Sequence, residues 1–229
     1  MSGAELDEVM RRAGQTRVFS SDPVPPETLT RILDAARFAP SGGNHQGWRV
    51  VVVADPDRKR ALRELYQPVW DAHRERLAQQ RLDAASGVTD HSVAPRTEDA
   101  ADRFVQTMDS VAYLLVVCVD LSALTITDSE LDRPSIVGGA SVYPFVQNLV
   151  LGCHAEGLGV ALTTLICRVE PAVIELLDIP AGFAVASLVA VGVIGPGGEL
   201  RRLSRRPVES FTYLDTFGAP WPVRDEHGG

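Results

Sequence analysis

The sequence has few of the features that mark several common classes of protein. It contains three cysteines without CxxC spacing and five histidines that form no zinc-type cluster, so neither a disulfide scaffold nor a metal site is expected. Its formal net charge of −8 argues against a nucleic-acid partner, which requires a basic surface. The longest strongly apolar run, residues 183–194, is too short to span a bilayer as a helix, so no membrane association is expected.

Signals for export and for several enzyme classes are also missing. The N-terminal segment is charged and amphipathic and lacks the apolar region of a signal peptide, which predicts a cytoplasmic protein. There is no GxxxxGK[ST] loop, no GxGxxG after a strand, and no Ser-His-Asp or Cys-His arrangement of catalytic residues. With 45% apolar and 23% charged residues, the composition is typical of a soluble globular protein. No linker divides the chain, which predicts a single domain over residues 1–229.

Hydrophobic periodicity predicts helices that alternate with strands. Four segments have apolar residues at helical spacing, and four short apolar runs are typical of strands covered on both faces. The helical segments are 6–13, 29–36, 62–69 and 142–153, and the strand runs are 49–54, 111–120, 159–164 and 183–194. Because helices separate the strands, the class is mixed α/β or α+β rather than a sandwich.

Three further segments stand out in this pattern. A helix over residues 138–155 contains no Asp, Glu, Lys or Arg, so we expect it to be buried nearly all round. Residues 83–98 and 121–135 are polar, lack clear periodicity and carry turn residues. Each is either a lid or binding loop, or a mobile loop without a role.

The segment Ala39–Arg49 is the most informative stretch for function. It lies between a predicted helix and a predicted strand, and its two adjacent glycines let the backbone approach a flat ligand or a phosphate. Ser41, Asn44 and Gln46 supply hydrogen-bond donors and acceptors that suit the polar rim of a flavin ring. From the residues alone, the segment is equally well explained as a turn with capping side chains.

The sequence Ala39-Pro40-Ser41-Gly42-Gly43-Asn44-His45-Gln46-Gly47-Trp48 resembles the A-P-S-x-x-N-x-Q-P-W signature of the nitroreductase family, with glycine in place of proline. Other segments resemble further elements of that family, in the family's order and over about residues 5–210. They are Arg17-Val18-Phe19, Gln147-Asn148-Leu149, Gly157-Leu158-Gly159, Leu162-Thr163-Thr164 and Arg205-Arg206-Pro207-Val208-Glu209. The ordered set is a more specific signal than any one segment.

The resemblance implies an α+β fold in which helices flank a central mixed sheet, built as an intertwined homodimer with FMN at each interface. The 138–155 helix would pack against its twin. The N-terminal helix and the tail over residues 205–229, with Tyr213, Phe217 and Trp221, would pack on the partner subunit.

The resemblance also implies roles for individual residues. Arg17 would face the N1/O2 side of the flavin, where a fixed positive charge favours the reduced form. Thr163 and Thr164 would lie near the ring, and Arg205 would hold the phosphate with its two parallel donors. Four residues would line the edge of the flavin: Ser41, Gly42, Asn44 and Gln46.

One motif departs from the family pattern. Where the opening motif of the family reads R-R-S, this chain has Ala13-Gly14-Gln15, so a phosphate-binding arginine and a hydroxyl are missing. Either Arg11 or Arg12 would have to reach the phosphate, and Gln15 would donate in place of the serine. Without these replacements, flavin binding would be weaker or the cofactor would differ.

The predicted function is that of an FMN-dependent oxidoreductase. NADH or NADPH would reduce the flavin, which would then reduce a nitroaromatic, a quinone or a similar electron-poor small molecule. Two alternatives stay open: a family variant that acts as a dehydrogenase, a dehalogenase or a flavin-modifying enzyme, and a non-catalytic flavin-binding protein. His45 is expected to be an exposed loop histidine, and the stripe of Tyr66, Trp70 and His73 is expected to be a packed helix face rather than a substrate wall.

Overall fold

The computed structural model describes residues 3–85, 96–198, 200 and 203–222. Its centre is a four-stranded sheet of β1 (Trp48–Val53), β2 (Tyr113–Asp120), β3 (Gly159–Thr163) and β4 (Phe183–Gly192), in the order β1-β2-β4-β3. Every neighbouring pair is antiparallel. All four strands coincide with the predicted apolar runs. The expectation of a mixed sheet is corrected for the described strands, because apolar runs indicate burial but carry no information on strand direction.

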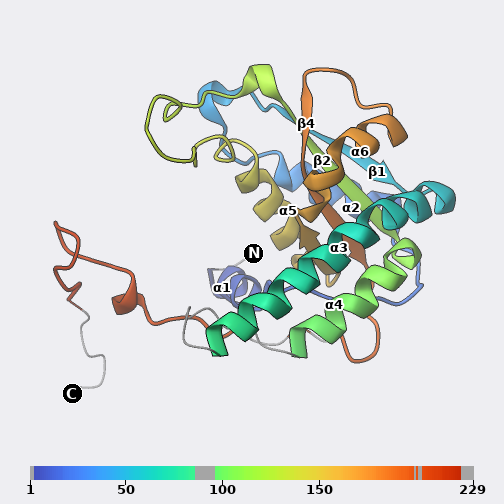
Figure 1. The fold of residues 1–229 in the computed structure, drawn as a ribbon, viewed down its shortest axis with the longest axis horizontal. Coiled ribbons are helices and arrows are strands. Elements are labelled where there is room, and N and C mark those ends of the chain that lie inside the picture. The colour runs from blue at the N-terminus through green and yellow to red at the C-terminus, as the bar shows by residue number, and fades with distance from the viewer. Residues whose placement is uncertain (1–2, 86–95, 199, 201–202, 223–229) are drawn as a thin grey trace.

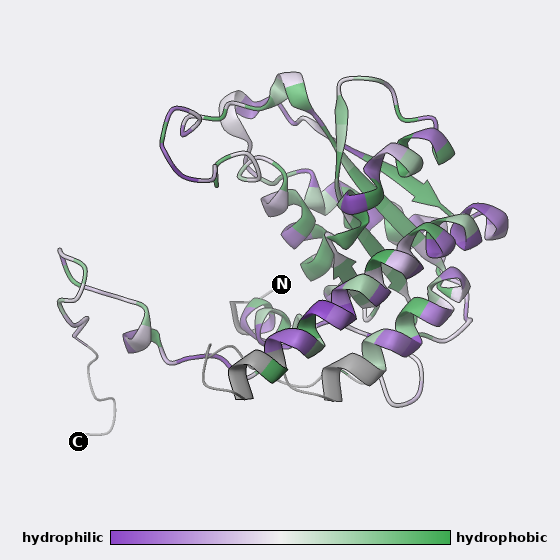
Figure 2. Ribbon diagram, in the orientation of Figure 1, coloured by the Kyte–Doolittle hydropathy of each residue, from purple (hydrophilic) through white to green (hydrophobic). Residues whose placement is uncertain are grey.

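Helices cover both faces of the sheet, which confirms the α+β class (Figure 1). One face packs against α2 (Pro26–Ala36) and α5 (Tyr143–Ala155), and the other against α3 (Pro56–Ala85), α4 (Arg96–Thr107) and α6 (Glu170–Leu176). Strand β2 shows the reason, since its alternate side chains Leu115 and Val117 enter the first core and Leu114 and Val116 enter the second. Figure 2 shows hydrophobic residues concentrated in these strands and polar residues along the outer surfaces of the helices.

Helix α5 begins later than predicted, at Tyr143, because residues 138–142 form turns. Pro144 occupies the first turn of the helix, where its missing N–H has no intrahelical partner to lose. The expectation that this helix is buried nearly all round is wrong for the single chain. One face of α5 is buried, through Phe145, Val146 and Leu149 among others, whereas Tyr143 and Gln147 are exposed.

The predicted excursion at 83–98 falls at the junction of two helices. Helix α3 continues to Ala85 and α4 begins at Arg96, while residues 86–95 lie outside the described part of the chain. At the start of α3 the Asp55 carboxylate accepts a hydrogen bond of 2.9 Å from the Arg58 N–H, as an N-cap side chain does. Within the described ranges, no helix combines the length and hydrophobicity needed to cross a bilayer.

The second predicted excursion, 121–135, consists of a short 3-10 turn, Leu121–Ala123, and irregular backbone. The carboxylate of Asp128, 5% exposed, holds this segment together. It accepts hydrogen bonds from the Ile136 N–H, the Ser135 hydroxyl and the Arg133 guanidinium, at 2.9, 2.7 and 2.7 Å. These donors, led by the Ile136 N–H, lower the pKa of Asp128 to about 2.

The C-terminal segment from Leu203 onward runs away from the body of the molecule (Figure 1). We call residues 203–222 the C-terminal arm. Several large apolar side chains on the arm are exposed, among them Phe211, Phe217 and Trp221, and Phe217 is 92% exposed. An extended segment with this much exposed apolar surface is typical of a chain that packs against another molecule.

Candidate functional site

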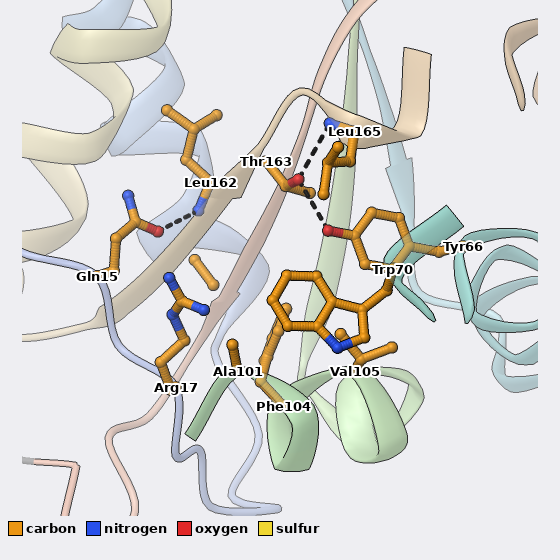
Figure 3. Close-up of a pocket in the computed structure, with 11 residues that line it drawn as sticks. Gln15, Arg17, Tyr66, Trp70, Ala101, Phe104, Val105, Leu162, Thr163 and Leu165 are labelled. Carbon is orange, nitrogen blue, oxygen red and sulfur yellow. Dashed lines mark hydrogen bonds between the residues drawn. The ribbon is translucent and has the colours of Figure 1, made fainter. Parts of the chain in front are cut away.

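A cavity of about 180 Å³ lies between the segment that contains Arg17, strand β3 and helices α3 and α4. Hydrogen bonding places the segment beside the sheet, since the Thr16 N–H donates to the Val160 carbonyl at 2.7 Å and Phe19 forms a bridge with Ile194. Figure 3 shows Arg17 and Gln15 on one side of the cavity and Tyr66 and Trp70 on the other. The remaining lining comes from Ala101, Phe104, Val105, Ala161, Leu162, Thr163 and Leu165.

The Arg17 side chain is a cation without a counterion in the part of the chain that the structure describes. Its Nε is buried and has no hydrogen-bond partner, and no ion pair to Arg17 occurs within the described part of the chain. Burial lowers the pKa of the guanidinium, because desolvation penalises the charged form. A buried charge that lacks a partner is costly in a protein interior, so this arrangement favours a bound acceptor or anion in the cavity.

Gln15 presents a second donor to the same cavity. Its Oε1 accepts a hydrogen bond of 2.7 Å from the Leu162 N–H of strand β3, which assigns the amide orientation because a backbone N–H requires an acceptor. The Nε2 amino group therefore carries the hydrogens that are free to donate. Gln15 and Arg17, both predicted site residues, are brought together here with Thr163.

The two threonines at the end of β3 differ in their surroundings. Thr163 is half-buried, and its hydroxyl lies 2.9 Å from the Tyr66 hydroxyl, whereas Thr164 is exposed. Tyr66 and Trp70 belong to the core cluster beneath α3 and also form a wall of the cavity. Tyr66 and Trp70 therefore belong both to a packed helix face, as expected, and to the wall of a cavity. The indole N–H of Trp70 donates to Asp102 at 2.6 Å.

A second, larger cavity of about 680 Å³ gathers positive charge between α1 (Gly3–Arg12), α5 and the start of the C-terminal arm. Arg11, Arg205 and Arg206 line it, together with Gln147 of α5. Arg11 pairs with Asp7 at 2.7 Å, and its carbonyl accepts a hydrogen bond from the Leu203 N–H at 3.1 Å. Arg12 is not part of the lining, so of the two candidate replacements for the missing family arginine, Arg11 is the one beside Arg205.

The Ser41–Gln46 loop lines neither of these cavities. Its polar groups bond locally: the Gln46 N–H donates to the Ser41 hydroxyl at 3.0 Å, and the Gln46 amide donates to Asn44 Oδ1 at 3.1 Å. The Gly42 N–H donates to the Ser141 hydroxyl at 3.0 Å. The turn interpretation is thus correct for the local geometry. Asn44, Gln46 and the exposed His45 keep polar atoms on the surface of the loop.

Helix α4 supplies residues that the sequence analysis missed. Ala101, Phe104 and Val105 line the Arg17 cavity from this helix. Their spacing, continued by Met108, follows the pattern of one buried helix face and could have been found. The polar segment that precedes them masked this signal.

Comparisons with known proteins identify the family of this chain. The model of the nitroreductase family matches residues 10–193. The chain is 25% identical to an iodotyrosine deiodinase from Nematostella vectensis, over 92% of this chain and 75% of the relative. It is 29% identical to a 5,6-dimethylbenzimidazole synthase from Rhodospirillum rubrum, over 88% of this chain and 90% of the relative.

Two solved structures have the same fold. An iodotyrosine deiodinase bound to FMN and 3-iodo-L-tyrosine superposes with a TM-score of 0.65 at 21% identity, covering 91% of this chain and 100% of that one. The NADPH:FMN oxidoreductase of Vibrio harveyi, in complex with NAD⁺, has a TM-score of 0.65 at 18% identity, covering 93% and 78% of the two chains. The family match spans most of the sequence and the fold agrees over nearly the whole chain, so this protein belongs to the nitroreductase family.

Proposed function

We propose that the protein binds FMN between two copies of the chain and uses NADH or NADPH to reduce an electron-poor small molecule, such as a nitroaromatic or a quinone. The observation that carries the proposal is the Arg17 cavity. There a partly buried guanidinium, without a counterion among the described residues, and the Gln15 amide both face a space with apolar walls. Bound FMN would supply the hydride and electron transfer at this site, and the protein would supply binding and electrostatics.

The residues present fit the two ends of such a cofactor. Arg17 and Gln15 offer donors to the carbonyl-bearing edge of a flavin, and the positive charge of Arg17 stabilises negative charge that develops there on reduction. Arg205, with Arg11 and Arg206 beside it, offers guanidinium donors to a phosphate. In this proposal Arg11 takes the place of the missing family arginine.

The proposal needs two subunits for three reasons. The Ser41–Gln46 loop, which includes Gly42, lines neither cavity of its own chain. It would therefore contribute the other edge of the flavin site to the partner subunit. Thr164 is exposed and would reach the ring from the side of β3. The C-terminal arm and the outer side of α5 expose Phe217 and Tyr143, and a partner subunit would cover such apolar surface.

The relatives favour one alternative reaction within the same site. The chain is similar over most of its length to an iodotyrosine deiodinase, so reductive dehalogenation of an aromatic ring is the second candidate function. The chain is also similar to a 5,6-dimethylbenzimidazole synthase, and a dehydrogenase or flavin-modifying activity would use the same binding residues. A cytoplasmic location without a nucleic-acid partner stays a prediction.

The decisive experiment is an anaerobic visible spectrum of the purified protein. We expect a yellow protein that bleaches on addition of NADH or NADPH and regains its colour with menadione or nitrofurazone. A protein that bleaches only with dithionite and regains colour with an iodophenol would favour the dehalogenase. A colourless protein that fails to take up added FMN would overturn the proposal.

A further inference from the structure

The backbone of the Ser41–Gln46 loop adopts an unfavourable conformation at two residues. Asn44 and Gln46 have φ angles of 56° and 49°, in the left-handed region that is uncommon for residues with a side chain. Such conformations persist only where the surrounding structure holds them in place, and they occur often at ligand-binding sites. The contacts that hold this loop therefore bear on its proposed role in the flavin site.

A turn at the end of strand β2 holds the end of this loop. Strand β2 ends at Asp120, whose N–H donates a hydrogen bond of 2.9 Å to the Gly47 carbonyl. The Asp120 carboxylate accepts hydrogen bonds from the Ser122 N–H and hydroxyl at 2.9 and 2.6 Å, which fixes the turn. The Ala123 carbonyl lies 3.3 Å from His45 Nδ1. These contacts join the end of the loop to the sheet.

The turn and the loop approach each other most closely at Gly47. This residue is buried, and a Cβ added to it would lie 2.7 Å from the Ala123 Cβ, closer than two such carbons can pack. Its φ lies outside the left-handed region, so the position requires the missing side chain and not the backbone freedom of glycine. A proline, which the similar nitroreductase signature has at this place, also carries a Cβ and would meet the same methyl group. Glycine therefore lets the turn pack directly on the loop.

We propose that Ala123 is a positioning residue for the Ser41–Gln46 loop, because its methyl group packs on Gly47 and fixes the end of the loop. The inference rests on the proposed function, in which Asn44 and Gln46 of this loop line one edge of FMN. Ala123 acts on the cofactor only through the loop. A loop that is already held in its binding conformation loses less conformational entropy when a ligand binds. Disturbing the contact between Ala123 and Gly47 should therefore weaken FMN binding.

The test exchanges one methyl group across this contact. Gly47→Ala adds a methyl group that collides with Ala123, Ala123→Gly removes the existing methyl group, and the double variant carries both changes. Val173→Ala is the control for loss of stability, because Val173 is fully buried in α6 and lines neither cavity. The readouts are the dissociation constant of FMN, from fluorescence titration of the full-length protein, and the melting temperature of the apoprotein.

We expect Gly47→Ala to weaken FMN binding by about tenfold, because the added methyl group displaces the loop. Ala123→Gly should weaken it by about threefold, and the double variant should bind FMN within about twofold of the wild type, because the contact is filled again from the other side. Val173→Ala should lower the melting temperature and leave the affinity for FMN unchanged.

Three results would overturn the inference. The first is wild-type affinity in Gly47→Ala. The second is a double variant that binds FMN no more tightly than Gly47→Ala does. The third is an equal loss of affinity in Val173→Ala and Gly47→Ala, because general destabilisation would then explain both.

The same experiment separates this inference from the function on which it rests. If the wild-type protein binds no FMN, the proposed function fails and the inference fails with it. If the wild-type protein and all the variants bind FMN equally well, only the inference fails. If Gly47→Ala does not fold, Ala123→Val crowds the same contact from a half-buried residue of the turn and should also weaken FMN binding by about tenfold. Wild-type affinity in Ala123→Val would then overturn the inference.

Discussion

Replacing Arg17 with methionine is expected to weaken cofactor binding without weakening the fold. In the absence of FMN the guanidinium is a partly buried charge with an unpaired Nε and with no ion pair within the described residues. Methionine keeps an apolar stem of similar reach and removes the desolvation cost. The apo variant should therefore be as stable as the wild type, or more stable.

The effect on FMN follows from the charge that is lost. A hydrogen bond to a charged group contributes about 1.5–3 kcal/mol, and this contribution applies chiefly to the reduced flavin because reduction places negative charge beside Arg17. At about 1.4 kcal/mol per 30 mV for a two-electron couple, the midpoint potential should fall by about 30–60 mV. Arg17→Lys should recover part of this loss, because lysine restores the charge without the planar fork.

Two measurements decide the outcome: a potentiometric titration of the FMN-saturated variants and thermal unfolding of the apoproteins. Arg31→Met is the matched control, since Arg31 forms an exposed pair with Glu156 at 2.7 Å away from both cavities. It should change stability by less than about 1 kcal/mol and leave the potential unchanged. An unchanged potential in Arg17→Met, together with a loss of apo stability, would refute the reasoning and make Arg17 a structural residue.

Three further outcomes follow from the structure. Arg205→Ala should weaken FMN binding by about 1.5–3 kcal/mol in calorimetric titrations and Arg206→Ala by less, and equal losses would indicate a diffuse basic patch. Light scattering should report a dimer of the 24.7 kDa chain, and a chain truncated after Ser204 should lose both the dimer and bound FMN; a folded full-length monomer would contradict this. Asp128→Asn should lower the melting temperature at pH 7. Because folding lowers the pKa of Asp128 to about 2 from about 3.9 when unfolded, that stabilisation is present above pH 4 and is lost as the pH falls through 2. Thermal unfolding of wild type and variant between pH 7 and pH 2 measures the difference, and a difference that does not shrink in acid would refute this account of Asp128.

The secondary structure could be predicted well where burial produces a strong periodic pattern. All four strands and helices α2 and α5 coincide with apolar patterns, because both core layers draw on the same alternating side chains of β2 and β4. Helix α4 was missed because its single apolar face follows a polar segment. The start of α5 was misplaced because glycines and Pro144 read as part of an apolar run, although residues 138–142 form turns.

The sequence nominated individual residues for the candidate site but not their arrangement in space. Arg17, Gln15 and Thr163 were identified from the resemblance to the family, and the structure brings them to one cavity. Tyr66 was expected to lie on a packed helix face and not in a cavity wall. A helix stripe that packs on the core gives no sign that one of its side chains also reaches a cavity. The cofactor-binding roles of all the predicted site residues stay predictions: Gln15, Arg17, Ser41, Gly42, Asn44, Gln46, Thr163, Thr164 and Arg205.

By itself, the sequence determined the family, the α+β class, the strand positions and the identity of the polar residues available for a flavin. These properties follow from local patterns, namely hydrophobic spacing and short motifs. The tertiary structure decided which residues meet. It placed Arg11 beside Arg205, brought the hydroxyls of Tyr66 and Thr163 within hydrogen-bond distance, and left the partly buried Arg17 without a counterion among the described residues. Such relations depend on how strands pair and helices pack, and no local pattern encodes them, because contacts between distant segments are set by the whole folded chain.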